Sequence, residues 1–131
     1  MNRNLYALLK ERFPSDRSAT LMELPDGSRQ DYAHLEAMAG RYAALLHKLG
    51  VKPGDRVAVQ TEKSPNAIYF YLGCLQAGAV YLPLNTAYTK SEVSYFLQDA
   101  EPVLVLCRPE SLSEIGKVAK AAQVKHLHGG V

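Results

Sequence analysis

Residues 61–89, TEKSPNAIYFYLGCLQAGAVYLPLNTAYT, contain the end of one strand, a helix, a second strand and a proline break. Ser64 suits the cap that precedes a helix, and Pro65 suits the first helical position, where its missing N–H is not needed. Gly78 follows the last helical turn, where a left-handed residue is common. The short apolar run after it closes at Pro83. A strand, a crossover helix and a further strand form the repeating unit of a parallel sheet.

The sequence on both sides continues this alternation. Apolar residues at helical spacing predict helices, and short continuous apolar runs predict strands that are covered on both faces. We expect helices near residues 4–13, 32–49, 89–97 and 111–122, and strands near residues 19–24, 29–31, 56–60, 103–107 and 124–128. The turn sequence PDGS joins the first two of these strands as a hairpin. The predicted fold class is therefore α/β, with an open, mostly parallel sheet, helices on both faces and an N-terminal hairpin.

Two of the predicted helices begin with the spacing of a capping box. Glu92 follows Thr89 by three residues, and Glu114 follows Ser111 by three residues. In this motif the side chain of the cap residue and the side chain of the glutamate each accept a bond from the other's backbone N–H. We therefore interpret these four side chains as structural.

Composition limits the class of protein. The chain has 131 residues and a formal net charge of +2, which suits one domain and argues against a nucleic-acid partner. Cys74 and Cys107 lack a CxxC partner and fall in a predicted helix and a predicted strand, so we expect buried, reduced thiols. The N-terminus lacks the features of a secretory signal, and no segment reaches the ~20 apolar residues of a membrane span. We expect a cytoplasmic protein with no membrane partner.

The sequence lacks the common motifs for phosphate, metal and nucleophile chemistry. It contains neither a Walker loop nor G-x-G-x-x-G, and it has no G-x-S-x-G elbow. His126 and His128 would share one face of a strand, and no third ligand is apparent, so we interpret them as surface histidines and expect no metal site. We identify no catalytic residue.

Two loops remain as candidates for contact with a ligand. Open α/β sheets bind ligands at the carboxyl ends of their strands, and two predicted strands end there with polar and apolar residues side by side. The candidate residues are Thr61, Lys63, Leu84, Asn85, Thr86 and Tyr88. The competing interpretation, which has more weight from these residues alone, is that Pro83 and Asn85 only shape the turn.

Three stretches resemble one enzyme family. They are residues 31–60, DYAHLEAMAGRYAALLHKLGVKPGDRVAVQ, residues 62–89, EKSPNAIYFYLGCLQAGAVYLPLNTAYT, and residues 91–107, SEVSYFLQDAEPVLVLC. Their amino-acid sequences resemble the N-terminal part of ATP-dependent, adenylate-forming acyl-CoA synthetases. Within that family the chain is most similar to malonyl-CoA synthetases.

The resemblance implies a fold and a reaction. It implies the N-terminal subdomain of the adenylate-forming enzyme fold, over residues 1–131, that ends before the ATP-binding loop. The full-length ligase would use ATP, Mg²⁺ and coenzyme A to convert a small carboxylate to an acyl-adenylate and then to an acyl-CoA. The similarity to malonyl-CoA synthetases implies malonate as this carboxylate and a role in fatty acid metabolism. A second carboxylate would need a partner such as arginine, and Arg56 and Arg108 are available.

None of the family's catalytic motifs has a counterpart here, so no catalytic residue carries over. We expect the 131-residue chain to be inactive alone, to hold no cofactor and to self-associate through an exposed apolar surface. One rival interpretation is a free-standing, non-catalytic α/β module that binds a ligand or a protein partner. Another is a small flavodoxin-like domain, although the acidic cluster or phosphate loop that it needs is not evident.

Overall fold

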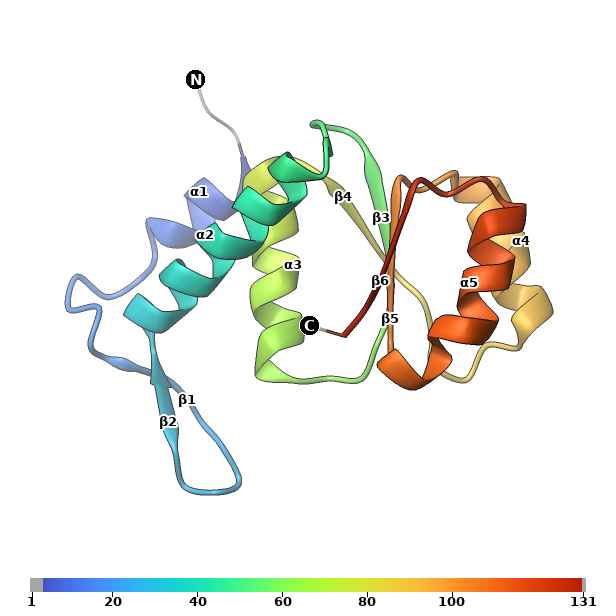
Figure 1. The fold of residues 1–131 in the computed structure, drawn as a ribbon. Coiled ribbons are helices and arrows are strands. Elements are labelled where there is room, and N and C mark those ends of the chain that lie inside the picture. The colour runs from blue at the N-terminus through green and yellow to red at the C-terminus, as the bar shows by residue number, and fades with distance from the viewer. Residues whose placement is uncertain (1–3, 131) are drawn as a thin grey trace.

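The unit predicted from residues 61–89 lies in the middle of the molecule (Figure 1). A computed structural model describes residues 4–130, in which β3 (Arg56–Gln60), α3 (Pro65–Ala77) and β4 (Val80–Pro83) follow one another. The Ser64 hydroxyl caps α3 by accepting a bond from the backbone N–H of Ala67, 3.1 Å away. Gly78 ends the helix with φ of 77°, a left-handed conformation that costs glycine little.

The sheet is parallel throughout the described residues, in the order β4-β3-β5-β6. Its other strands are β5 (Leu104–Cys107) and β6 (His126–Gly129). A separate antiparallel hairpin joins β1 (Thr20–Glu23) to β2 (Arg29–Asp31). The fold class expected from the sequence is therefore confirmed, including the N-terminal hairpin.

Helices cover both faces of this sheet (Figure 1). On one face, which we call the α2/α3 face, α2 (Tyr32–Lys48) and α3 cover Val57 and Val59 of β3. On the other, the α4/α5 face, α4 (Lys90–Ala100) and α5 (Leu112–Ala121) cover Val105 and Cys107 of β5. Alternate residues of each strand thus enter different cores, as the pleat requires.

A third apolar cluster lies on the side of α2 and α3 that faces away from the sheet. Helix α1 (Leu5–Lys10) begins at Asn4, whose side-chain oxygen accepts a bond from the backbone N–H of Tyr6. Tyr6 then packs with Ala39 of α2 and Tyr69 of α3. The hairpin adds partly buried residues to the same cluster, so α1 and the hairpin are anchored to the two helices.

One prediction needs correction. The Ser111–Glu114 capping box does not form, because a 3₁₀ turn over Pro109–Ser111 precedes α5 and Ser111 already has helical dihedrals and makes no side-chain cap bond. The parts of the expectations that concern residues 1–3 and 131 lie outside the described residues.

Candidate functional site

Three loops meet at the carboxyl ends of the parallel strands. They comprise residues 61–64 after β3, residues 84–89 after β4 and Arg108 after β5, and we call this region the carboxyl edge. Because the strands are parallel and adjacent, segments far apart in the sequence arrive at one side of the sheet. The sequence-based candidates all lie in the first two of these loops.

A buried glutamine holds the first two loops together. Gln60, the last residue of β3, is 4% exposed and donates from Nε2 to the backbone oxygen of Asn85 over 2.9 Å. The backbone N–H of Leu84 donates in turn to the oxygen of Val59 over 2.8 Å. The loop after β4 therefore starts from a position that the sheet itself determines.

Asn85 closes the turn with its own side chain. Its Oδ1 accepts a bond of 2.8 Å from the backbone N–H of Ala87, and its backbone oxygen accepts one of 3.0 Å from Tyr88. This is an Asx turn, which is the structural role that we weighed against ligand contact for Asn85. Thr86 is exposed beside it, and Thr61 is half-buried after β3.

Leu84 and Tyr88 belong to an apolar hollow on the α4/α5 face. The Tyr88 ring stacks on Phe96 of α4, with ring centroids 5.0 Å apart and an interplanar angle of 18°. The hollow measures about 250 Å³ and also contains Pro83 and Leu97. Stacking on α4 fixes the Tyr88 ring in the core-facing side of the loop.

Lys63 lines a different and larger hollow, on the side of the hairpin. We call it the Lys63 groove; it measures about 550 Å³ and is mostly apolar. Its walls include Met22 of β1, Ile68 and Tyr71 of α3, and Tyr81 of β4. Lys63 and Tyr88 thus share the carboxyl edge but line separate hollows on opposite faces of the sheet.

Arg108 is the residue at this edge whose setting the sequence alone left open. Its Nη1 lies 3.3 Å from Oε1 of Glu62, which joins the loop after β5 to the loop after β3. Its Nε is buried and has no hydrogen-bond partner within residues 4–130. Arg56 lies at the opposite end of β3 and donates to the backbone oxygen of Ala100 over 2.8 Å. Of the two arginines, only Arg108 is therefore at the carboxyl edge.

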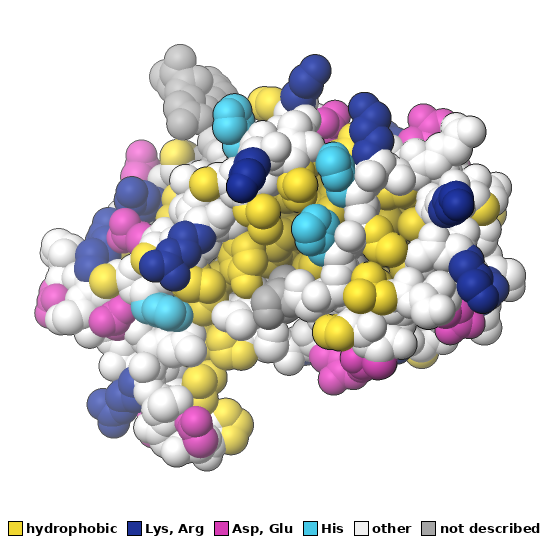
Figure 2. Space-filling model, viewed as in Figure 1, with side chains coloured by type: hydrophobic (Ala, Val, Ile, Leu, Met, Phe, Trp, Pro, Cys, Tyr) yellow, Lys and Arg dark blue, Asp and Glu magenta, His cyan; other side chains and the backbone are white. Residues whose placement is uncertain are grey.

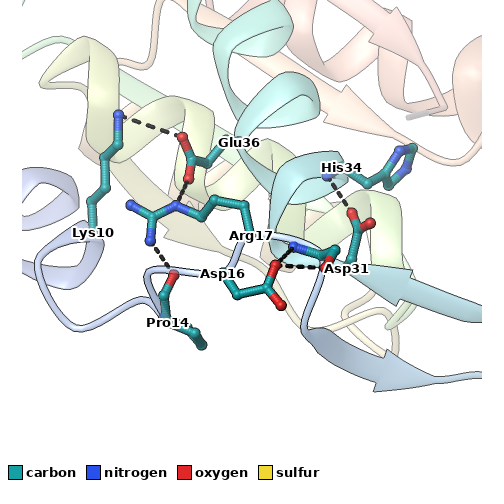
Figure 3. Close-up of polar contacts among 8 residues, drawn as sticks. Lys10, Pro14, Asp16, Arg17, Asp31, His34 and Glu36 are labelled. Carbon is teal, nitrogen blue, oxygen red and sulfur yellow. Dashed lines mark hydrogen bonds and ion pairs between the residues drawn. The ribbon is translucent and has the colours of Figure 1, made fainter.

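A second cluster of polar residues lies beside the first turns of α2, and its members bind one another (Figure 3). Glu36 pairs with Lys10 over 3.5 Å and with Arg17, and Arg17 also donates to the backbone oxygen of Pro14. These contacts tie the loop between α1 and β1 to α2. We therefore interpret this cluster as structural.

Neither cysteine is set up as a nucleophile. Cys74 and Cys107 are free and buried, as expected from the sequence. Burial raises the pKa of Cys74 to about 12 and also raises the pKa of Cys107. Thiolate, the reactive form, is therefore disfavoured at both positions near neutral pH.

Residues 4–130 contain no group of three or more His, Cys, Asp or Glu side chains that could hold a metal ion. Of the helices in this range, none is long and apolar enough to cross a membrane.

One known protein family matches most of the chain. The profile of a family described as AMP-binding enzyme matches residues 9–129. Tyrocidine synthase 3 of Brevibacillus parabrevis is 30% identical over 120 residues, which is 92% of this chain and 2% of that protein.

Several solved structures resemble this chain over nearly its whole length. Apo MatB from Rhodopseudomonas palustris has a TM-score of 0.90 and 44% identity, over 98% of this chain and 26% of MatB. ATP-bound MatB gives a TM-score of 0.88 and 45% identity, over 98% of this chain and 25% of that chain. The N-terminal domain of FACL13 from Mycobacterium tuberculosis has a TM-score of 0.83 and 29% identity, over 98% and 34%. The chain thus spans about a quarter of MatB and a third of that N-terminal domain.

Proposed function

The chain belongs to the AMP-binding enzyme family, whose members are adenylate-forming ligases, and we propose that it is the N-terminal subdomain of an ATP-dependent acyl-CoA ligase. The observation that carries this proposal is the match to MatB, at 44% identity over 98% of this chain but only 26% of MatB. The solved FACL13 domain supports the same reading, since this chain corresponds to about a third of it. Residues 1–131 would then form one part of a larger catalytic unit.

The proposed reaction has two steps. The carboxylate of the substrate attacks the α-phosphorus of ATP, and pyrophosphate leaves as the acyl-adenylate forms. The thiol of coenzyme A then attacks the acyl carbon, and AMP leaves with the electron pair of the cleaved bond. Adenylation is needed because a free carboxylate is a poor electrophile, and Mg²⁺ would neutralise the phosphate charge.

The cofactors follow from this reaction class. ATP is supported by the ATP-bound MatB structure, whereas Mg²⁺ and coenzyme A follow only from the proposed chemistry. Malonate is supported by the resemblance of residues 62–89 to malonyl-CoA synthetases. The cytoplasm, where ATP and coenzyme A are both present, is the proposed location.

This chain would position parts of the active site and would supply none of the reacting groups. Gln60 fixes the loop after β4 against the loop after β3, and Arg108 joins the loop after β5 to Glu62. We propose that the carboxyl edge supports the ATP-binding half of the ligase and shapes part of its acyl or coenzyme A entrance. Its substrate-proximal residues would be Thr61, Lys63, Leu84, Asn85, Thr86 and Tyr88.

A chimera tests the proposal directly. This chain would replace the part of R. palustris MatB that it matches, about a quarter of that chain, and ATP–pyrophosphate exchange would be measured with malonate, acetate and benzoate. We expect exchange that depends on malonate, and none from the 131-residue chain alone. MatB from which the same part is deleted is the control, and it should be inactive. A folded chimera without exchange would contradict the proposal.

The Lys63 groove favours one alternative. Its volume of about 550 Å³ falls in the range of ~300–1,000 Å³ that is common for small-molecule pockets, and Lys63 adds a cation to its lining. A free-standing module that binds a small acyl ligand would use this groove. Titration of the isolated chain with short-chain carboxylates and their coenzyme A esters distinguishes the two, because the ligase proposal predicts no measurable binding.

A further inference from the structure

Within residues 4–130, no helix covers β6 on the α2/α3 face of the sheet. In the register of the sheet, His126 and His128 of β6 lie beside Leu104 and Leu106 of β5, so these four residues share that face. Leu127 points the other way and packs in the α4/α5 core. On the α2/α3 face, the helices therefore cover β5 but leave β6 open.

A narrow slot marks this opening, and we call it the α2–β6 slot. It is lined by Tyr42, Leu45, Leu49, Phe70, Leu104, Leu106, His128 and Gly130. Figure 2, which views the molecule from the β6 side, shows hydrophobic side chains gathered in the middle of the surface, with histidine side chains beside them. Leu45 is 39% exposed at the slot, although its neighbour Leu46 is fully buried.

The size of the slot excludes a substrate as its occupant. It measures about 40 Å³, far below the ~300 Å³ at which small-molecule pockets begin. Such a volume accepts one apolar side chain. The occupant that fits is therefore a protein segment that inserts a single side chain between α2 and β6.

The end of β6 lies at the same place. Gly130 lines the slot and donates to the backbone oxygen of Cys107 over 2.8 Å, which continues the pairing of β6 with β5. Gly130 also lies against Pro109, and the neighbouring Arg108 has a buried Nε without an acceptor within residues 4–130. A chain that continues beyond Gly130 would thus start at the slot and beside an unused donor.

The surroundings of the slot carry positive charge. Arg41 and Lys48 lie four residues before and three residues after Leu45 on α2, and both are exposed. Residues at these spacings occupy the same helix face, so both cations flank Leu45. His128 is exposed on the β6 side. A fitting occupant would therefore carry acidic residues beside its apolar anchor.

We propose that the α2–β6 slot is the docking site of the segment that follows residue 131 in the same polypeptide. This inference rests on the proposed function, in which the chain is part of a longer ligase. The segment would place one apolar side chain in the slot and acidic side chains toward Arg41 and Lys48. A second copy of the chain fits less well, because a two-fold contact would bring the same cations of both copies together.

Thiol labelling tests this assignment. Both native cysteines are buried, so Leu45→Cys adds the one exposed thiol of the described residues, and Leu8→Cys on α1, where the leucine is 50% exposed, is the matched control. Maleimide labelling rates at residues 45 and 8 would be measured by peptide mass spectrometry, in the isolated chain and in the MatB chimera. We expect similar rates at the two positions in the isolated chain and, in the chimera, labelling at residue 45 that is slower by about tenfold or more.

An unchanged ratio of the two rates in the chimera would overturn the docking site. A rate at residue 45 that falls with rising concentration of the isolated chain would also overturn it, because the occupant would then be a second copy. ATP–pyrophosphate exchange in the same chimera reports on the proposed function separately. A chimera that is active but labels freely at residue 45 would leave the ligase proposal standing and remove this inference.

Discussion

At Gly73, α3 approaches α2 so closely that a side chain does not fit. A Cβ atom there would lie 2.6 Å from Cβ of Tyr42 and 3.1 Å from the backbone oxygen of Ala39. The backbone of Gly73 has no positive φ, so the constraint is space rather than conformation. The close packing at this glycine is thus a property of the α2–α3 contact.

We expect Gly73→Ala to lower the free energy of unfolding by about 1–3 kcal/mol, because rigid neighbours on α2 must move. Gly40→Ala is the matched control, since a Cβ at Gly40 meets nothing within 4 Å and alanine is the better helix former by about 1 kcal/mol. Urea denaturation followed by circular dichroism measures both. If the two variants change stability in the same direction, the close approach is not what selects glycine at position 73.

Cys74 makes stability depend on alkaline pH. Burial raises the pKa of its thiol from 9.0 to about 12, so the folded state holds the proton more tightly than the unfolded chain does. The stabilisation from this group is complete below pH 9 and is lost as the pH rises toward 12. Tyr42, Tyr69 and Tyr81 also have raised pKa values through burial and act in the same direction.

Cys74→Ala should therefore flatten the alkaline part of the stability curve without removing it. The free energy of unfolding would be measured from pH 7 to pH 11 for both proteins. The variant starts lower at pH 7, because it loses buried volume, and then falls less steeply above pH 9. Parallel curves for the two proteins would mean that the Cys74 thiol does not titrate as its burial implies.

At the scale of elements, α4 and α5 both have the capping-box spacing in their sequences, but the capping box forms only in α4. Thr89 and Glu92 form both bonds of a capping box, at 3.2 Å and 3.0 Å. Ser111 and Glu114 have the same spacing, but Pro109 starts a 3₁₀ turn one step earlier and places Ser111 inside the helical segment. The motif spacing is local, whereas the entry of the chain into the helix depends on what precedes it.

Thr89→Ala is expected to cost about 0.5–2 kcal/mol of stability, the usual range for loss of an N-cap. Ser111→Ala is its control and should change stability by less than about 0.5 kcal/mol, because Ser111 makes no cap bond. Thermal unfolding of the two variants decides the point. Equal losses would show that Ser111 caps α5 in solution.

The elements could be predicted well where the local signals agree. Ser64, Pro65 and Gly78 mark both ends of α3, and the continuous apolar run of β5 requires cover on both faces. The site was less accessible to prediction. The sequence places Lys63 and Tyr88 at one edge of the sheet, but their opposite faces follow from how α3 and α4 pack. The buried Nε of Arg108 had no signal in the sequence, because it depends on the three-dimensional surroundings.

At the scale of the whole molecule, β4 is an open edge with apolar surroundings. Among the described strands it pairs only with β3, and Val80 is 42% exposed. Ile68 and Tyr71 of the Lys63 groove lie beside it and are also exposed. Unpaired edges next to apolar surface favour association.

We expect the isolated chain to self-associate through this edge at high concentration. Static light scattering should give a mass above that of the monomer, and Val80→Lys should restore the monomer because a charge on an edge strand opposes pairing. Tyr95→Lys on α4, where the tyrosine is 66% exposed, is the control and should leave association unchanged. A monodisperse monomer at every concentration would count against self-association through the β4 edge.

The coding sequence beyond codon 131 decides whether this chain is the N-terminal part of an adenylate-forming ligase. We expect an open reading frame that soon reaches a threonine-, serine- and glycine-rich ATP-binding loop and extends the protein to about the length of MatB, of which this chain covers 26%. A stop codon directly after codon 131 would contradict the ligase proposal and make the free-standing binding module the better description.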